Sequence, residues 1–232
     1  MKNIQDEKLL QTALQKYELD KIVDLEKKPP FSLQYYDANE VILHEGTELE
    51  SLLFLVVGKV KVTSSVATGK SLLLRFVQPF SVIGDIELIR NVSVQSQIKA
   101  VEKSLLIGLP RDYIKKYEQD NPKLLHLLLD HVAYKLQTCT TASRVNLLAS
   151  VENRFASYLL STLAADADHP FGLELKTTNL QEIAGLLGTT YRHLNRVVHS
   201  LIEREIITKD RHFIQIQDWS LLEKLSNDIR YE

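Results

Sequence analysis

Hydrophobic and polar residues change their spacing along this chain, and each spacing predicts a different structure. Between residues 30 and 110, short runs of β-branched, aromatic and leucine residues are separated by turns rich in glycine, asparagine and aspartate. Short runs of this kind, recurring at roughly ten-residue intervals, are typical of an antiparallel barrel or sandwich. The expected strands cover 34–36, 41–43, 52–57, 60–62, 72–77, 98–101 and 105–109.

A long helix is expected after this β-rich region. Asn121-Pro122 is a helix start, because asparagine caps the free N–H groups and proline is tolerated in the first turn. Beyond it, one set of positions recurs at alternating spacings of four and three, the pattern of paired helices. This set, called the seam below, consists of Leu125, Leu129, Val132, Leu136, Cys139 and Ser143. The same spacing continues to Asn146, a polar residue that is compatible with fixing the register of two helices. It predicts a parallel homodimer; a helix packed on its own domain is the alternative.

Residues 181–201 predict two short helices joined by a tight turn at Gly188. Apolar residues of the second helix follow one face, and Thr189 or Thr190 can cap its start. The other face carries polar and cationic side chains, and no acid stands between 190 and 202. This is the layout of a helix-turn-helix whose second helix enters a DNA major groove. An ordinary helical hairpin with a solvated face is the plainer alternative.

A two-stranded wing is expected directly after these helices. Ile206-Ile207 starts one strand, residues 209–212 form a turn, and 213–216 return. A wing of this kind contacts phosphates beside the groove, here through Lys209 and Arg211.

Composition narrows the choice of function. The 232 residues are 44% hydrophobic and 25% charged, which is ordinary globular usage, and the net charge is −2. No apolar run reaches the ~20 residues of a membrane span, and residues 1–29 suit an amphipathic helix rather than a signal peptide. A cytoplasmic protein is expected. Acids slightly outnumber bases in 151–232, so we expect modest DNA affinity with a clear salt dependence.

Several short motifs extend the picture over about 30 to 216. They are Glu45-Gly46, 58–62 with Gly69-Lys70, 82–88, 169–172, and 181–184 with Gly188. In this order and at these separations they resemble the CRP/FNR family of bacterial transcription regulators. Residues 86–89 and 191–194 resemble its YeiL-type branch.

The resemblance implies an α+β fold in four parts. An N-terminal helix (1–29) precedes a jelly-roll-like antiparallel β-roll that senses an effector (30–115). A dimerisation helix (116–150) and a winged helix-turn-helix (151–232) follow. The implied partners are a second copy of the chain, double-stranded DNA with a twofold-symmetric operator, and RNA polymerase.

The resemblance also implies which residues read DNA. Tyr191, Arg192 and Arg196 stand at base-contacting positions, and Arg196 can bind guanine in a bidentate manner. Arg192 stands where many members carry a glutamate, so the half-site is expected to differ from theirs. The residues expected near phosphate or base are Thr190, Asn195 and His199.

An effector pocket is implied between the roll and the long helix. Its expected residues are Gly84, Asp85, Ile86, Glu87, Val94, Gln95, Cys139 and Thr140. Cyclic-nucleotide members pair the cyclic phosphate with an arginine, and Val94 stands in its place. A buried phosphate without a cation is strongly disfavoured, so control by cAMP in the usual mode is not expected. The effector is unknown.

Other chemistries find little support in the sequence. Iron–sulfur members need four cysteines and haem members a recognisable axial ligand, but the chain has one cysteine and, within the roll, only His44. A metal-dependent barrel enzyme needs two or three histidines with a carboxylate, so we expect no enzyme. The second hypothesis is an effector-binding or redox-sensing module with little DNA specificity. Under this hypothesis Cys139 would be the redox-active group. The simpler interpretation is that Cys139 is a small apolar residue packed in the core.

Overall fold

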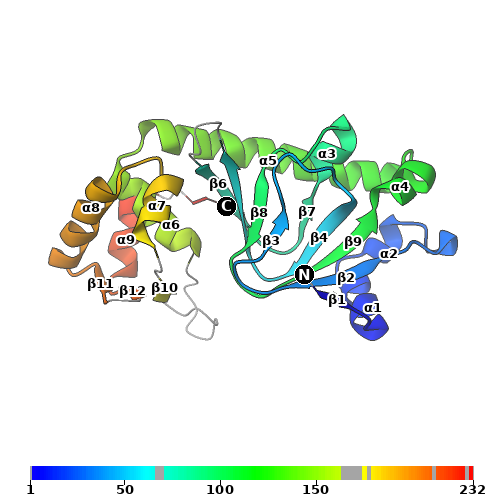
Figure 1. Ribbon diagram of the computed structural model, residues 1–232, viewed down its shortest axis with the longest axis horizontal. Coiled ribbons are helices and arrows are strands. Elements are labelled where there is room, and N and C mark those ends of the chain that lie inside the picture. Colours follow the sequence, from blue (N-terminus) through cyan, green and yellow to red (C-terminus); the bar gives the residue numbers. More distant parts are fainter. Residues whose placement is uncertain are drawn as a thin grey trace. The chain divides into compact units, whose positions relative to one another are not determined.

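The computed structural model describes the chain except residues 1, 66–70, 163–173, 177–178, 211–212, 228–229 and 232, and except the side chains of 142, 144, 145 and 174–176. Two compact units emerge (Figure 1). The first contains Met1–Ser64 and Val77–Gln137, and the second contains Ser65–Phe76 and Thr138–Glu232. Among the described residues no helix is long and apolar enough to cross a membrane.

The first unit is an antiparallel β-roll. Five strands form one sheet, in the order β1 (Lys2–Ile4), β2 (Ser32–Tyr36), β9 (Ser104–Pro110), β4 (Ser51–Val57) and β7 (Ser81–Ile83). In the other sheet β3 (Val41–Leu43), β8 (Gln97–Ala100) and β5 (Val60–Ser65) lie side by side. All seven strands expected from the sequence are present within one to three residues, counting β6 (Ser71–Val77). The short strands β1 and β7 were not expected.

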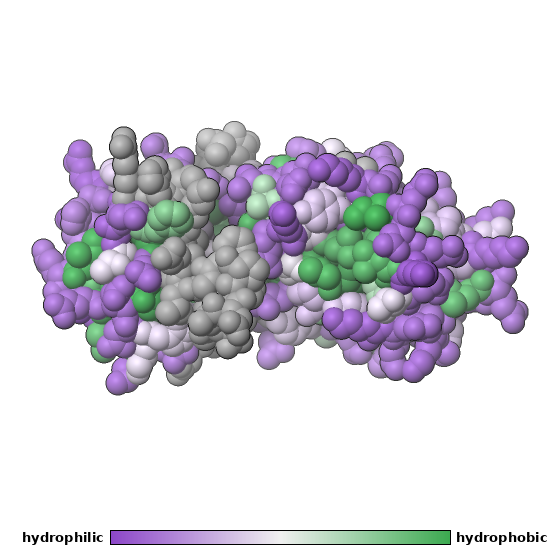
Figure 2. All heavy atoms as spheres, turned by 90° about the horizontal axis from the view of Figure 1, so that it is seen from below, coloured by the Kyte–Doolittle hydropathy of each residue, from purple (hydrophilic) through white to green (hydrophobic). Residues whose placement is uncertain are grey.

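The core of the roll lies against the five-stranded sheet. Five consecutive residues of β4, from Leu52 to Val56, are buried, because this strand lies between β9 and β7 and both of its faces are covered. The Phe80 ring stacks between those of Tyr17 and Phe54, at centroid distances of 5.0 and 5.9 Å. The Tyr17 hydroxyl donates to the Val56 carbonyl at 2.8 Å, which fixes the N-terminal segment on the sheet. Figure 2 shows an apolar patch within a mostly hydrophilic face of this unit.

Residues 1–29 do not form the single amphipathic helix that was expected. β1 is followed by α1 (Glu7–Lys16), α2 (Leu19–Ile22) and a 3-10 turn at Leu25–Lys27. The break falls at Glu18, whose φ of 57° is left-handed. This turn lets Leu19, which is fully buried, enter the core together with Leu14 of α1. Burial in the core therefore overrides the local helical pattern.

Helices close the roll and lead out of it. α3 (Asp85–Arg90) follows β7, while α4 (Arg111–Tyr113) and a π-helical turn (Ile114–Glu118) follow β9. α5 then runs over Pro122–Leu148, as its start signal predicted. The Asn121 side chain accepts from the N–H groups of Lys123 and Leu124 at 3.0 and 3.3 Å.

The second unit carries the C-terminal elements. Its helices are α6 (Val151–Thr162), α7 (Leu180–Leu186), α8 (Tyr191–Glu203) and α9 (Trp219–Ser226). A small antiparallel sheet has the order β10 (Glu174–Lys176), β12 (Phe213–Ile216) and β11 (Ile207–Lys209). The expected α+β class, with a β-roll, a long helix and a winged helix-turn-helix, is confirmed; the third strand of the wing sheet, β10, was not expected.

Candidate nucleic-acid interface and effector region

The two helices expected at 181–201 are present as α7 and α8. Asn179 caps α7 by accepting from the N–H of Gln181 at 3.0 Å. Gly188 has a φ of +61°, the left-handed conformation that the tight turn requires. The Thr190 hydroxyl accepts from the His193 N–H at 3.2 Å and so caps α8. Local sequence signals alone therefore set where both helices begin.

α8 is strongly two-faced. Leu194, Val198 and Leu201 are at most 1% exposed and pack into the second unit. The expected base-contacting residues Tyr191, Arg192 and Arg196 are all exposed. The other polar residues expected to contact DNA are Thr190 and His199, which are exposed, and Asn195, which is half-buried. A capped helix thus presents a cationic face without carboxylates, the geometry needed to enter a major groove.

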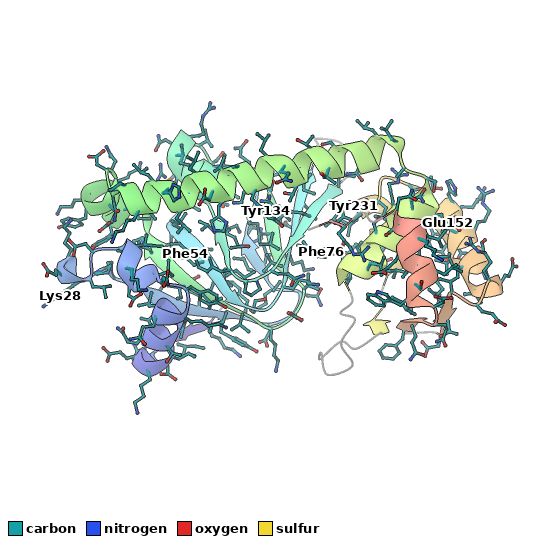
Figure 3. All side chains as sticks on the ribbon, turned by 180° about the vertical axis from the view of Figure 1, so that it is seen from behind. Lys28, Phe54, Phe76, Tyr134, Glu152 and Tyr231 are labelled. Atoms are coloured by element: carbon teal, nitrogen blue, oxygen red, sulfur yellow. The ribbon has the colours of Figure 1, made fainter. Side chains whose placement is uncertain are left out.

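An ion pair holds the far end of α8. Arg204, the C-terminal cap residue, pairs through its guanidinium with the carboxylate of Glu152 in α6. Figure 3 labels Glu152 within the second unit. Both side chains are 30–41% exposed, so the pair contributes little to stability. Its effect is geometric, because it limits the direction in which α8 can turn on α6.

The wing matches its expected strands. β11 and β12 pair with Ile207 opposite Ile216 and Lys209 opposite Ile214. The turn is closed by Asp210, which accepts from the Phe213 N–H at 2.7 Å. Lys209 is exposed at the end of β11. Arg211, the other expected wing contact, lies outside the described residues, as does the expected 169–172 loop.

The seam side chains of α5 are open to solvent in the single chain. Leu125, Leu129 and Leu136 are 47%, 63% and 70% exposed. Val132 is half-buried, and Cys139 and Ser143 are exposed. Leu124 and Leu128, in contrast, are at most 3% exposed and anchor α5 to the roll. The helix therefore uses one face for its own unit and leaves an apolar face uncovered.

The effector region of the first unit begins at Gly84. Its φ is +93°, and a Cβ built on it would lie 2.7 Å from Leu49 Cδ1, so only glycine fits here without displacement. The next residue, Asp85, starts α3 and is 1% exposed. Tight backbone packing thus carries a carboxylate into the interior of the roll.

Asp85 is paired with a cation that the sequence did not indicate. The ammonium of Lys135, on α5, forms an ion pair with Asp85 Oδ1 and donates to the Val82 carbonyl at 2.8 Å. The exposed fractions of the two side chains are 12% and 1%. Asp85 Oδ1 also accepts from the Ile86 N–H at 2.9 Å, while Oδ2 is buried and has no partner. The pair fastens α5 to the segment that precedes α3.

The other expected effector residues of the first unit differ in their burial and in their hydrogen bonds. Val94, at the place of the phosphate-binding arginine, is 1% exposed and joins the turn at 45–47 through its own N–H, which donates to the Thr47 carbonyl at 2.8 Å. The Glu87 carboxylate accepts from the Gln95 N–H at 3.0 Å. Ile86 is 40% exposed, so its side chain points away from the core.

Cys139 and Thr140 lie on α5, one turn beyond Lys135, and both are exposed in the single chain. The role of a buried packing residue for Cys139 is therefore wrong for the chain by itself. Its place on the seam is the reason, because this face of α5 is uncovered.

Comparison with known proteins agrees with these features. Residues 33–121 match the cyclic nucleotide-binding domain family, and 153–225 match the Crp-like helix-turn-helix domain family. The cAMP-activated global transcriptional regulator CRP of Salmonella typhimurium is 27% identical over 179 residues, covering 75% of this chain and 83% of that protein. The regulatory protein YeiL of Escherichia coli is 25% identical over 179 residues, covering 77% and 78%.

The fold has a solved counterpart. The crystal structure of a CRP-family transcriptional regulator from Thermus thermophilus superposes with a TM-score of 0.70 at 20% identity, covering 86% of this chain and 98% of that one. The first of these relatives is a global transcriptional regulator, and the second is a regulatory protein. Domain matches, relatives and fold together show that the chain belongs to the CRP/FNR family of transcription regulators.

Proposed function

We propose that this protein is a homodimeric regulator that binds a specific DNA operator through α8. One observation carries the proposal: a helix capped by Thr190 presents Tyr191, Arg192 and Arg196 to solvent on a face without acids. An arginine in the major groove donates to both guanine acceptors, and Lys209 in the wing can reach a phosphate. Bound beside a promoter in the bacterial cytoplasm, such a dimer would act through RNA polymerase.

A charge-matched pair of variants tests the assignment of Arg196. Arg196→Ala removes one cation from α8, and Arg90→Ala removes one from the exposed end of α3. We expect Arg196→Ala to weaken operator binding by about 10- to 100-fold and to relax one base position. Arg90→Ala should leave affinity within about twofold. Equal losses on operator and random DNA would reassign Arg196 to phosphate contact.

The exposed seam supports the dimer. Three leucines of α5 expose apolar surface, and a second copy that covers this surface lowers the free energy of the assembly. They are Leu125, Leu129 and Leu136. Two copies paired along parallel helices would present two α8 helices to two half-sites. A twofold-symmetric operator follows from that arrangement.

We further propose that cAMP does not control this protein in the usual mode. Val94 offers an apolar side chain where a cyclic phosphate needs a cation, and Lys135 is already paired with Asp85. Nearby, Glu87 adds a second carboxylate, and Arg90 is directed to solvent. A phosphate monoanion in this region would be desolvated beside carboxylates.

Calorimetric titration with cAMP tests this second proposal. The protein should give no saturable heat up to about 1 mM cAMP, a concentration at which even a weak site with a binding free energy near −4 kcal/mol would be half filled. The cAMP-activated CRP of Salmonella typhimurium serves as the positive control. Saturable binding at micromolar cAMP would contradict the reasoning from Val94.

A further inference from the structure

A segment that precedes the long helix in sequence is packed into the C-terminal unit. Residues Ser71–Phe76, which make up most of β6 and are called the strap below, follow the roll strand β5 along the chain. They nevertheless cluster with Thr138–Glu232. The strap is therefore a part of the DNA-binding unit that its place in the sequence did not predict.

The strap reaches the turn of the helix-turn-helix. Leu72 Cδ1 lies 3.7 Å from the position that a Cβ on Gly188 would occupy, which is ordinary van der Waals contact. At the other end of the strap, the Phe76 ring packs on the ring of Tyr158 in α6, with centroids 5.8 Å apart. One strand thus spans from α6 to the residue that separates α7 from α8.

Tyr231 forms hydrogen bonds with the strap, with α6 and with α5, and this set of bonds is called the lock below. The Phe76 N–H donates to the Tyr231 carbonyl, and Figure 3 shows these two residues near one another. The Tyr231 N–H donates to Ser161 Oγ of α6 at 2.8 Å, and its hydroxyl donates to Asn146 Oδ1 of α5 at 3.1 Å. The side chain is 2% exposed, and burial raises its pKa to about 12.

The same network contacts the turn from a second side. The Asn146 carbonyl accepts from Arg154 Nη1 at 3.0 Å, and this guanidinium nitrogen lies 3.9 Å from the Cβ position at Gly188. Leu72 and Arg154 therefore both border the turn, and Tyr231 bonds to the segments that hold each of them. Loss of one residue, Tyr231, would loosen both borders.

We propose that Tyr231 is a positioning residue that fixes the helix-turn-helix by holding the strap and α6 together. The effect on DNA rests on the function proposed above; the mechanical coupling does not. When the lock opens, the strap and the turn at Gly188 open as one cooperative unit, and α8 loses its fixed direction. The consequence is a loss of operator affinity rather than a loss of non-specific binding, since only base readout demands an exact helix direction.

Hydrogen exchange on the full-length protein tests the coupling. Tyr231→Ala should raise amide exchange at least tenfold in both 71–76 and 180–203 relative to the wild-type chain. The matched control is Leu222→Ala, which truncates a fully buried residue of α9. It should raise exchange in α9 and leave 71–76 within twofold. Tyr231→Phe keeps the ring and loses only the bond to Asn146, so it should give an intermediate, severalfold increase.

The outcomes separate the two proposals. If 71–76 exchanges faster in the Tyr231 variants while 180–203 does not, or if neither changes, the positioning role is overturned. If Tyr231→Ala fails to fold, Tyr231→Phe decides by the same criterion. Coupled exchange in a protein that enriches no DNA motif would sustain the lock and defeat the proposed function. Coupled exchange with at least a tenfold loss of operator affinity, and unchanged binding to random DNA, supports both.

Discussion

Breaking the ion pair between Lys135 and Asp85 should cost this protein much more than removal of a surface lysine. Lys135→Met keeps the length of the side chain and removes its charge. The Asp85 carboxylate is 1% exposed, and without the ammonium it keeps only the Ile86 N–H on Oδ1, since Oδ2 has no partner. Stranding one charge of a buried pair destabilises proteins by about 3–5 kcal/mol.

A double-mutant cycle isolates the electrostatic part of that cost. Asp85→Asn together with Lys135→Met removes both charges, so the double variant should regain most of the loss and stay within about 1–2 kcal/mol of wild type. Lys123→Met is the matched control. It lies on the same helix, and its ammonium donates to the Lys21 carbonyl at 2.8 Å, but it is exposed. We expect it to change stability by at most about 0.5 kcal/mol.

The assay is urea unfolding of the wild type, the two single variants Lys135→Met and Asp85→Asn, the double variant and the Lys123→Met control, followed by far-ultraviolet circular dichroism. The free energy in water is obtained by linear extrapolation, with separate transitions fitted if the two units unfold separately. A Lys135→Met protein within 1 kcal/mol of wild type would refute the argument that the pair is buried and essential. A double variant as unstable as the single one would show that packing, and not charge, dominates.

Four further predictions concern single sites. Gly84→Ala should destabilise the protein by about 1–3 kcal/mol in urea, since it forces a positive φ and a contact with Leu49; an unchanged midpoint would contradict this. Thr190→Ala should cost about 1 kcal/mol through the lost cap, measured in the same way, and no change would mean that the cap is made in another way. Leu129→Glu should give monomers in sedimentation while leaving the far-ultraviolet circular dichroism of the folded chain nearly unchanged, because the residue is 63% exposed in the single chain; a persistent dimer would move the interface elsewhere. Burial raises the pKa of Tyr231 to about 12, so the stability that its neutral form contributes is complete below pH 10 and is lost as pH rises from about 10 to 12; Tyr231→Phe should remove this part of the alkaline destabilisation, and an unchanged pH profile would contradict it.

Local signals explain what the sequence predicted well. The start of α5 at Asn121-Pro122, the left-handed Gly188 and the Thr190 cap are decided by residues within one helical turn of each other. The two faces of α8 follow from a 3.6-residue period that only one orientation satisfies. For these reasons the position and the exposure of the α8 side chains were predictable, whereas their contact with DNA stays a prediction and Arg211 lies outside the described residues.

Contacts between distant residues explain what the sequence did not predict. Lys135 and Asp85 are separated by fifty residues, and nothing near either one announces the other. The break at Glu18 depends on the pocket that receives Leu19, not on residues 1–29 themselves. The strap likewise packs with residues far along the chain, and the Phe76 N–H donates to the Tyr231 carbonyl. Each of these features is determined by contacts between residues that are distant in the sequence.

The same distinction between local signals and distant contacts explains how much of the effector region was predictable. Val94 was expected to exclude the usual phosphate contact, and its burial at 1% exposure is consistent with that expectation. The cation that does lie in this region, Lys135, comes from α5 and is committed to a carboxylate. Lys135 lies far in the sequence from Val94, so the absence of an arginine at Val94 did not indicate this lysine.

The central claim is that this chain reads DNA sequence with α8, and selection from a random duplex library tests it most directly. The purified protein should enrich a twofold-symmetric motif with half-sites about one helical turn apart, at two salt concentrations. Arg196→Ala should enrich the same motif with one base position relaxed in each half-site. Weak binding that salt abolishes, with no motif enriched by the wild-type protein, would contradict the account and favour a sensing module with little DNA specificity.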